Sequence, residues 1–322
     1  MDKKNLYYAA ALLAAALVLM VSAMLFTDFK YPAQSQGTLV FADSFKKGAE
    51  LDKIVIENPR GTITLELQDN LWRVKEAGGY FANTYLLNKL LVDINTSAFY
   101  SRRENTPRAI KDFALEMPQS GTRISTYGGS NKYNTVTIGK PADNRQYRFA
   151  LLENGEIWLV SGAFELPEEK YSWLLQPVLE LPPSLIETIR FYKDGKVISA
   201  GRQEPYQDFS DSSARSIKAK TLTNLLSHLT VDDISGSKGF DKEGLTLSQR
   251  MEIITFQGLV FYFDFYENTA HDETWIQITL STTPLPMSVV NDYIKDNRFL
   301  YDGWYFKLPP ASGEILKPAS LI

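Results

Sequence analysis

The chain opens with one uninterrupted apolar stretch, and the remainder alternates between strand-like and helix-like patterns. Leu6–Phe26 contains no charged residue, no Gly and no Pro. As a helix at about 1.5 Å per residue it would span about 31 Å, close to the hydrocarbon thickness of a bilayer. Lys3 and Lys4 precede it, so the positive-inside bias predicts a cytoplasmic N-terminus and an extracytoplasmic body. The pattern predicts a single-pass transmembrane anchor over residues 1–27.

A cleaved signal peptide is the alternative interpretation of this stretch. Val21-Ser22-Ala23 resembles the small-residue site at which signal peptides are cut. The apolar core of a signal peptide is only about 7–15 residues long, however, which is shorter than Leu6–Phe26. We therefore favour an anchor that stays attached.

One face of the predicted membrane helix carries only small side chains. These side chains belong to Ala10, Ala11, Ala14 and Ala15. Small residues at this spacing let a second membrane helix approach closely, so they are the candidate interaction site. The competing explanation is that alanine is simply a good helix former.

Residues 28–50 form a predicted juxtamembrane tether, because Pro32 and Gly37 interrupt any helix. A first α+β unit is expected over 51–185. Period-two alternation predicts antiparallel strands at 54–57, 62–67, 71–74, 123–127, 135–138, 147–152 and 156–160.

Helices are expected between and after these strands. Asn83 is a good N-cap for a helix with one apolar face, formed by Tyr85, Leu86, Leu90 and Ile94 with Leu87 and Leu91 beside them. Thr106-Pro107 begins a short second helix, and a third is expected near 168–175. The Asn154-Gly155 and Asp194-Gly195 pairs predict hairpin turns.

A second, similar unit is expected over 186–322. Ile189 aligns with Ile54, and Leu225 aligns with Leu90 at the same sequence offset. Ile254 aligns with Ile124 at a slightly smaller offset. Strands at 251–256, 260–265 and 274–280, a helix at 287–297 and a last strand at 304–306 complete it. The predicted fold is therefore α+β, with two tandem antiparallel-sheet-plus-helix units after the anchor. The alternative is that any two meander–helix–meander units look alike.

Composition narrows the function. The net charge is −4, with 34 basic and 38 acidic residues, which argues against a nucleic-acid-binding surface. The absence of cysteine excludes disulfides, thiolate metal sites and a cysteine nucleophile. Only two histidines, His228 and His271, are available for triads or metal sites. We expect no catalytic residues, no cofactor and no metal.

Two polar features of the sequence are candidate metal sites. Glu267, Asn268, His271, Asp272 and Glu273 could hold a divalent cation, since imidazole and carboxylates are common ligands. They lie between two strong strand patterns, so a polar hairpin loop is the favoured interpretation. His228 is expected at the surface or boundary of a helix rather than as a ligand.

Acidic pairs and aromatic residues are candidates for a hydrolase site or a binding site. Glu168-Glu169 and Asp232-Asp233 are adjacent acids, whereas a glycosidase needs two carboxylates facing each other across a cleft. The aromatic run 261–266 is expected to supply core and cross-strand partners. An exposed aromatic stripe that binds a ligand is the alternative.

Several motifs of the first unit occur together in a characteristic order. They are Ile54-Val55-Ile56, Gly61, Leu71-Trp72-Arg73-Val74, Phe81-Ala82-Asn83, Leu86, Leu90-Leu91, Phe113-Ala114-Leu115, Ile138-Gly139, Tyr147 and Ile157-Trp158-Leu159-Val160. In these motifs the unit resembles a known family, the periplasmic domain of unknown function 4340 found in bacterial membrane proteins. The resemblance covers residues 51–195 best, and Phe81 and Asn83 stand where the family usually has Pro and Asp at a helix cap. These motifs specify structure, and the resemblance implies no catalytic or ligand-binding residue.

What the resemblance implies is an auxiliary role in an ABC transport system of the bacterial inner membrane. The sequence thus predicts a non-catalytic, single-pass, extracytoplasmic accessory or scaffold subunit whose partner is an integral membrane protein, such as an ABC transporter permease. One alternative is a tethered module that binds a cell-envelope ligand in the cleft between the two units. A carboxylate-based envelope hydrolase is the third hypothesis.

Overall fold

The structure is a computed structural model that describes residues 37–46, 49–143, 145–210, 213–238, 240, 245–268 and 273–316, with only the backbone for 213–218. The predicted membrane anchor and its alanine face lie outside these residues. Within the described part of the chain, no helix has both the length and the apolar character needed to cross a membrane.

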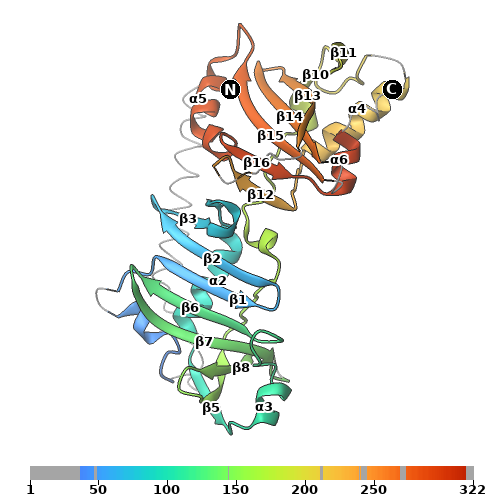
Figure 1. The fold of residues 1–322 in the computed structure, drawn as a ribbon. Helices are drawn as coiled ribbons and strands as arrows, with labels where there is room; N and C mark the ends of the chain where they lie inside the picture. Colours follow the sequence, from blue (N-terminus) through green and yellow to red (C-terminus); the bar gives the residue numbers. More distant parts are fainter. Residues whose placement is uncertain are drawn as a thin grey trace.

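The described chain forms two antiparallel sheets that lie one beyond the other along the long axis of the molecule (Figure 1). The first sheet has the order β4-β3-β2-β1-β6-β7-β8-β9-β5. Its strands are β1 (Lys53–Asn58), β2 (Gly61–Gln68), β3 (Leu71–Val74), β4 (Tyr80–Phe81), β5 (Phe99–Arg103), β6 (Thr122–Gly128), β7 (Asn131–Pro141), β8 (Tyr147–Leu152) and β9 (Ile157–Ser161).

The second sheet has the order β11-β10-β13-β14-β15-β16-β12. Its strands are β10 (Ile186–Lys193), β11 (Lys196–Gly201), β12 (Asp233–Gly236), β13 (Thr246–Thr255), β14 (Leu259–Asn268), β15 (Glu273–Thr282) and β16 (Trp304–Lys307). The α+β class expected from the sequence is therefore confirmed for the described residues.

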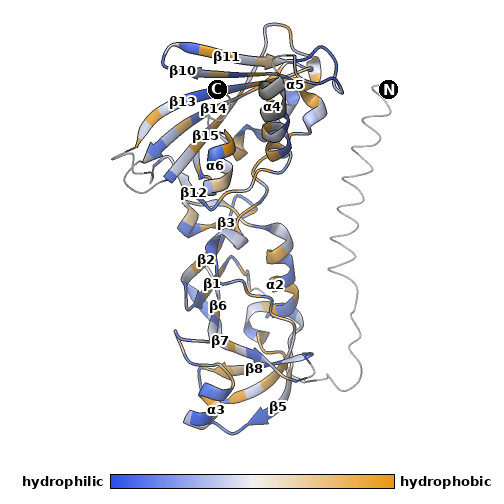
Figure 2. Ribbon diagram, turned by 90° about the vertical axis from the view of Figure 1, so that its right-hand side faces the viewer, coloured by the Kyte–Doolittle hydropathy of each residue, from blue (hydrophilic) through white to orange (hydrophobic). Residues whose placement is uncertain are grey.

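Helices cover one face of each sheet. The α-helices are α2 (Thr84–Thr96), α3 (Pro107–Asp112), α4 (Ser213–Leu226), α5 (Ser288–Asn297) and α6 (Pro310–Leu316). Short 3-10 turns occur at η2 (Ala42–Phe45), η3 (Lys75–Ala77), η4 (Lys170–Trp173), η5 (Pro183–Leu185) and η6 (Arg298–Leu300). In Figure 2, α2 and α5 lie on the same side of the molecule, with the strands of both sheets on the other.

Local sequence signals explain several of these boundaries. The Asn83 Oδ1 atom accepts hydrogen bonds from the backbone N–H groups of Tyr85 (3.1 Å) and Leu86 (3.2 Å), which confirms Asn83 as the N-cap of α2. Thr106 caps α3 in the same way, with Pro107 at its first turn.

One of the two predicted hairpin turns is confirmed as a two-residue turn, and the other is a longer loop than predicted. Asp194 (φ 50°) and Gly195 (φ 71°) join β10 to β11 with Lys193 opposite Lys196, as a two-residue turn requires. At Asn154-Gly155 the strands are further apart, because β8 ends at Leu152 and β9 begins at Ile157.

The prediction of a helix at 168–175 is wrong, because this segment contains a single 3-10 turn, η4, and no α-helix. Residues after Trp173 are extended instead: Ala82 forms a bridge with Leu174, and the N–H of Leu175 donates to the carbonyl of Phe81 at 2.8 Å. Backbone pairing with the end of β4 therefore replaces the helical hydrogen bonds.

The two sheets share one topology. When the hairpins β1–β2 and β10–β11 are matched, the order β2-β1-β6-β7-β8-β9-β5 corresponds to β11-β10-β13-β14-β15-β16-β12. In both, a helix follows the hairpin, and the next strand adds to the far edge of the sheet. The first unit adds β3 and β4, and the second adds α5 between β15 and β16.

Strand register corrects two of the residue pairs expected from the sequence. Ile56 lies opposite Ile124, and its counterpart Phe191 lies opposite Met251, so Met251 rather than Ile254 corresponds to Ile124. The helices shift by one residue as well. Leu90 is buried, but Leu225 is only half-buried and Leu226 fills the core position.

An aromatic junction joins the two units. Tyr80 of β4 packs edge-to-face on Trp304 (centroids 5.0 Å apart) and on Phe306 (5.8 Å), both in β16. Phe81 packs in the same way on Phe299 of η6 at 5.2 Å. Such pairs contribute about 0.5–1.5 kcal/mol beyond the area that they bury. The buried residues of both units consequently form one continuous core.

The segment that leads from the first unit to the second is itself paired. The side-chain amide of Gln176 exchanges two hydrogen bonds of 2.9 Å with the backbone of Val231, one in each direction. The N–H of Val178 donates to the carbonyl of Leu229 at 2.8 Å, and Lys170 forms an ion pair with Asp233 at 2.6 Å. This segment is therefore an integral part of the junction.

Candidate functional site

The outer faces of the two sheets, opposite the helices, carry the polar side chains that could form a site. Along β13, Met251 and Ile253 point into the core, so Arg250 and Glu252 point outward. A groove of about 680 Å³ lies on this face of the second sheet. Its walls are the hairpin residues Tyr192–Val197 and the β13 residues Leu247–Arg250, and its floor includes Glu252 and Tyr262.

Glu252 is the most buried charged group of this groove. The residue is 7% exposed although it lies on the outer face of the sheet. Its Oε2 atom accepts hydrogen bonds from Arg190 Nη1 (3.2 Å) and from the Tyr192 hydroxyl (2.8 Å). The hydrogen bond to Glu252 is the largest cause that raises the pKa of Tyr192, while burial raises the pKa of Tyr262. Glu252 is therefore compensated by its neighbours on β10.

A second ion pair lies across the neighbouring strands. Arg250 donates two hydrogen bonds to Asp264, from Nε at 2.5 Å and from Nη2 at 2.8 Å. Its guanidinium also lies 5.5 Å from the centroid of the Tyr262 ring. Gln249 contributes to the lining of the groove, but it lies opposite the buried Phe265, so its side chain is on the inner face of the sheet, and its buried Nε2 atom has no hydrogen-bond partner among the described residues.

The first sheet has a groove at the corresponding place. It measures about 490 Å³ and includes Glu57, Arg123, Ser125 and Thr135. Arg123 is the register counterpart of Arg250, because Glu57 lies opposite Arg123 as Tyr192 lies opposite Arg250. Arg123 pairs with Glu57 at 3.5 Å, and the hydroxyls of Ser125 and Thr135 are 3.1 Å apart. Both grooves can therefore offer paired charges and hydroxyls to a polar ligand.

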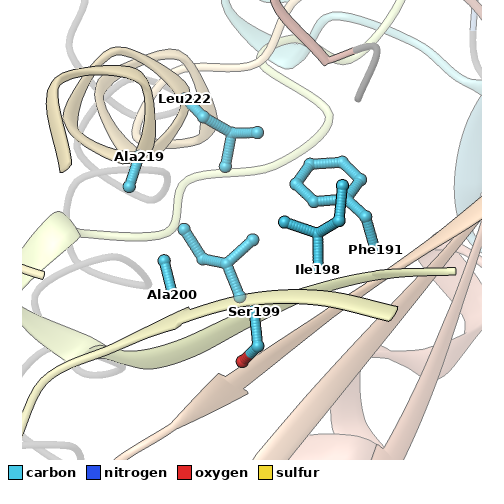
Figure 3. A pocket seen from close by; sticks show the side chains of 7 residues that line it. Phe191, Ile198, Ser199, Ala200, Ala219 and Leu222 are labelled. Atoms are coloured by element: carbon cyan, nitrogen blue, oxygen red, sulfur yellow. The ribbon is translucent and has the colours of Figure 1, made fainter. Parts of the chain in front are cut away.

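One small cavity belongs to the core and not to a site. It lies between the β10–β11 hairpin and α4, where Phe191, Ile198, Ala200, Ala219 and Leu222 converge (Figure 3). Its volume is about 10 Å³, and its walls are almost wholly apolar. A space of that size holds at most about one water molecule, and apolar cavities stay dry.

The histidine and polar-loop residues are distributed as ordinary surface groups wherever the structure describes them. His228 is exposed just beyond the end of α4, with its Nδ1 atom 3.9 Å from Glu180, which confirms the boundary interpretation. Glu273 accepts from Lys307 Nζ at 2.5 Å and from Trp275 Nε1 at 3.3 Å. His271 and Asp272 lie outside the described residues. Within the described ranges, no three potential metal ligands gather.

In the two acidic pairs, Glu168, Glu169 and Asp233 form ion pairs with basic residues. Arg60, at the tip of the β1–β2 hairpin, lies 3.7 Å from Glu168 and 3.5 Å from Glu169. Asp233 accepts from Lys170 and from the backbone N–H of Ile234. These carboxylates hold the ends of hairpins and the junction in place.

The aromatic run on β14 is mainly core, as expected. Phe261, Phe263 and Phe265 are fully buried, and only the alternate Tyr262 and Tyr266 are on the opposite face. The expectation of a cleft between the units is corrected, because Tyr80, Trp304 and their aromatic neighbours fill the described junction.

Sequence reasoning missed the Glu252 cluster. Arg190 and Glu252 are directly opposite each other only once β10 and β13 are paired. The signal was a charged residue at an alternate position of two apolar strands, but the sequence does not reveal which strands are neighbours.

The fold and its faces define a class of protein: an α+β body of two topologically matched antiparallel sheets, each with one open polar face. Residues 72–248 match the family described as a domain of unknown function (DUF4340), and the chain belongs to this family. The resemblance drawn from the sequence is thus confirmed. The matched region begins in β3 and ends in β13, so it includes Tyr80 and Phe81 and the segment that joins the two units, while their aromatic partners on η6 and β16 lie beyond it. No curated protein and no solved structure gives a significant match.

Proposed function

We propose that this protein is a non-catalytic, single-pass, extracytoplasmic accessory subunit of a membrane complex, with an ABC transporter permease as its partner. The anchor is the uncharged stretch Leu6–Phe26 behind Lys3 and Lys4, which places the bulk of the chain outside the cytoplasm. The transport partner is what the family resemblance implies.

The observation that supports a scaffold best is the aromatic junction. Aromatic contacts join the two sheets in one core, so the open faces of the sheets are held at a fixed separation. The residues in contact are Tyr80, Phe81, Phe299, Trp304 and Phe306. A protein that only tethered a ligand would not need two units coupled in this way. A scaffold does, because it must present surfaces in a defined geometry.

We also infer that the two units arose by tandem duplication of one α+β unit, with boundaries at 51–185 and 186–322. The shared strand order and the matching pairs Ile56–Ile124 and Phe191–Met251 support it. Duplication gives a simple route to a body with two similar faces.

The partner is proposed to contact the membrane helix through Ala10, Ala11, Ala14 and Ala15. The test is co-purification of the full chain from membranes, followed by mass spectrometry. Replacing Ala10 and Ala14 with Leu should weaken recovery of a polytopic partner, since the larger side chains keep a second helix away. Ala9→Leu with Ala16→Leu is the matched control, because these alanines face the opposite side of a helix.

Two results would contradict the proposal. Equal partner recovery from both double variants would remove the alanine face. A mature protein whose N-terminus begins at Met24 would remove the anchor itself. A gene next to those of a permease and an ATPase would support the transport partner.

A second candidate function is a tethered module that binds a cell-envelope ligand, and the groove around Glu252 favours it. Buried compensated charges and tyrosines on an open sheet face are suited to a polar ligand. Calorimetric titration with soluble cell-wall glycan fragments tests it. Binding that is lost in Arg250→Ala but retained in Arg123→Ala would assign the ligand to the second sheet.

A further inference from the structure

Large apolar side chains are exposed along the helix side of the molecule. On α2, Tyr85 is 70% exposed. Val92 is also exposed, on the side of the helix opposite the buried Leu90. On the second unit, Leu285 is 93% exposed at the tip of the loop before α5. The set consists of Leu39, Tyr85, Val92, Leu285, Met287, Val289, Tyr293 and Phe299, and we call it the helix-side stripe.

Most apolar side chains of the stripe on α5 do not pack in the hydrophobic core. Only Val290 of α5 is fully buried, and Ile294 is packed partly against the core. The first unit has no counterpart of α5, because β8 and β9 are joined by a short loop. The insertion therefore adds apolar surface that the core does not use. Exposed apolar groups that gather on one side mark an interaction surface.

The two halves of the stripe are on the same side and meet at the junction. Figure 2 shows α2 and α5 on one side of the molecule, away from the strands of both sheets. Phe299, which follows α5, packs on Phe81, which precedes α2, at 5.2 Å. Phe299 is itself 48% exposed and so connects the apolar residues of the two helices.

The described chain joins the fold at one end of this stripe. The carbonyl of Thr38 accepts from Phe99 at 3.1 Å, and the N–H of Val40 donates to Ser97 at 2.9 Å. Exposed Leu39 therefore lies beside the end of α2. Residues 27–36 separate this point from the predicted anchor, and even fully extended they reach only about 35 Å.

We propose that the extracytoplasmic body lies against the bilayer that anchors it, with the helix-side stripe in contact with the lipid interface. The inference rests on the proposed membrane anchor. Tyrosines together with Leu, Met and Phe suit this region, where one end of a side chain is apolar and the other wet. A short tether also keeps the surface at high effective concentration near the membrane.

The charges beside the stripe indicate which lipid surface fits. Asp292 and Asp296 are exposed on α5, with Lys295 between them, and Lys89 lies beside Tyr85 on α2. This mixed-sign set offers no basic patch for anionic headgroups. Contact should therefore come from apolar insertion into a zwitterionic surface. The outer sheet faces, with both grooves, would then point away from the bilayer.

The absence of cysteine gives a direct test with the full chain. Leu285→Cys, Tyr85→Cys and, as a control on the second sheet, Val197→Cys each carry an environment-sensitive fluorophore. Each protein is reconstituted alone into phosphatidylcholine nanodiscs with or without spin-labelled lipid. Val197 is a matched control because it is also an exposed apolar residue, 56% exposed, on β11.

The expected result is blue-shifted emission and quenching by spin-labelled lipid at positions 285 and 85, about twofold or more above that at position 197. Equal, solvent-like signals at all three positions would overturn the proposal. So would shielding of positions 285 and 85 that arises only when a permease is added, since a partner protein would then cover the stripe. Failure of the protein to enter the nanodiscs would instead disprove the anchor.

A second variant checks that the apolar side chains themselves make the contact. Leu285→Ser with Met287→Ser should reduce lipid quenching of a label at Tyr293→Cys while leaving the circular dichroism spectrum unchanged, because both side chains are exposed. Unchanged quenching would show that the loop before α5 plays no part and would contradict the assignment of that end of the stripe.

Discussion

The ring of Tyr80 meets the ring of Trp304 edge-to-face, with centroids 5.0 Å apart and planes at 81°. Tyr80 closes the first sheet, and Trp304 begins β16 of the second. The contact therefore helps to couple two topologically matched units, together with the Phe81–Phe299 ring pair. Tyr80 is also 1% exposed, so a change there disturbs a buried point of the junction.

Tyr80→Ala and Trp304→Ala should both destabilise the chain, and their effects should not add. Truncating a buried aromatic side chain costs about 3–5 kcal/mol, with less expected for the half-buried Trp304. Of this, about 0.5–1.5 kcal/mol should be coupling energy between the rings. A double-mutant cycle measured by urea unfolding of the detergent-solubilised chain checks it. Strict additivity of the two changes would contradict a direct contact.

Gly78 should be far less replaceable than its neighbour Gly79. Both have positive φ, 66° and 86°, so an alanine carries backbone strain at either position. At Gly78 a Cβ atom would also lie 2.7 Å from the backbone nitrogen of Gly236, whereas nothing lies within 4 Å at Gly79. Gly78→Ala should therefore lower the unfolding midpoint clearly more than Gly79→Ala. Equal shifts would mean that the junction yields at this point.

Leu226, and not Leu225, should behave as the counterpart of Leu90. Leu226 is fully buried and Leu90 is 2% exposed, so Leu→Ala at either should cost about 2–5 kcal/mol. Leu225 is half-buried, and Leu225→Ala should cost distinctly less. Thermal or urea unfolding of the three variants separates them. A larger loss at Leu225 would restore the alignment drawn from the sequence alone.

Most of the fold could be predicted from local sequence signals. Asn83, Thr106 and the Asp194-Gly195 pair fix a cap or a turn through their own side chains and backbone preferences, and alternation then reveals the strands between them. These features depend on neighbours in sequence, so they could be predicted without knowing the tertiary structure.

What could not be predicted depends on pairing between distant segments. The strands β5 and β12 are short and lie at the edges of their sheets, so each pairs with one neighbouring strand. The sequence of β5, Phe99–Arg103, therefore shows no clear alternation of apolar and polar residues. The Glu252 cluster and the Tyr80–Trp304 contact likewise need the register or the junction to be known. A spacing in the sequence cannot distinguish Leu225 from Leu226, because a one-residue shift leaves both as leucine.

Two buried tyrosines, Tyr80 and Tyr301, should make the protein sensitive to alkaline pH. Burial is the main cause that raises the pKa of Tyr80 and of Tyr301 well above the usual value of about 10. Above pH 10 the unfolded chain releases these protons while the folded chain keeps them, so the free energy of unfolding falls as pH rises. Below pH 10 both states are protonated, and these groups have no effect.

Urea unfolding between pH 8.5 and 11.5 measures this slope, to which each such tyrosine adds at most about 1.4 kcal/mol per pH unit. Tyr80→Phe and Tyr301→Phe should each flatten the slope, because phenylalanine has no proton to lose. Tyr206→Phe is the matched control for removal of a tyrosine hydroxyl, since the Tyr206 side chain is 93% exposed. Absorbance at the tyrosinate band should show some tyrosines ionising only as the chain unfolds. If all tyrosines instead ionised together near pH 10 in the folded protein, the junction would have to be open to water.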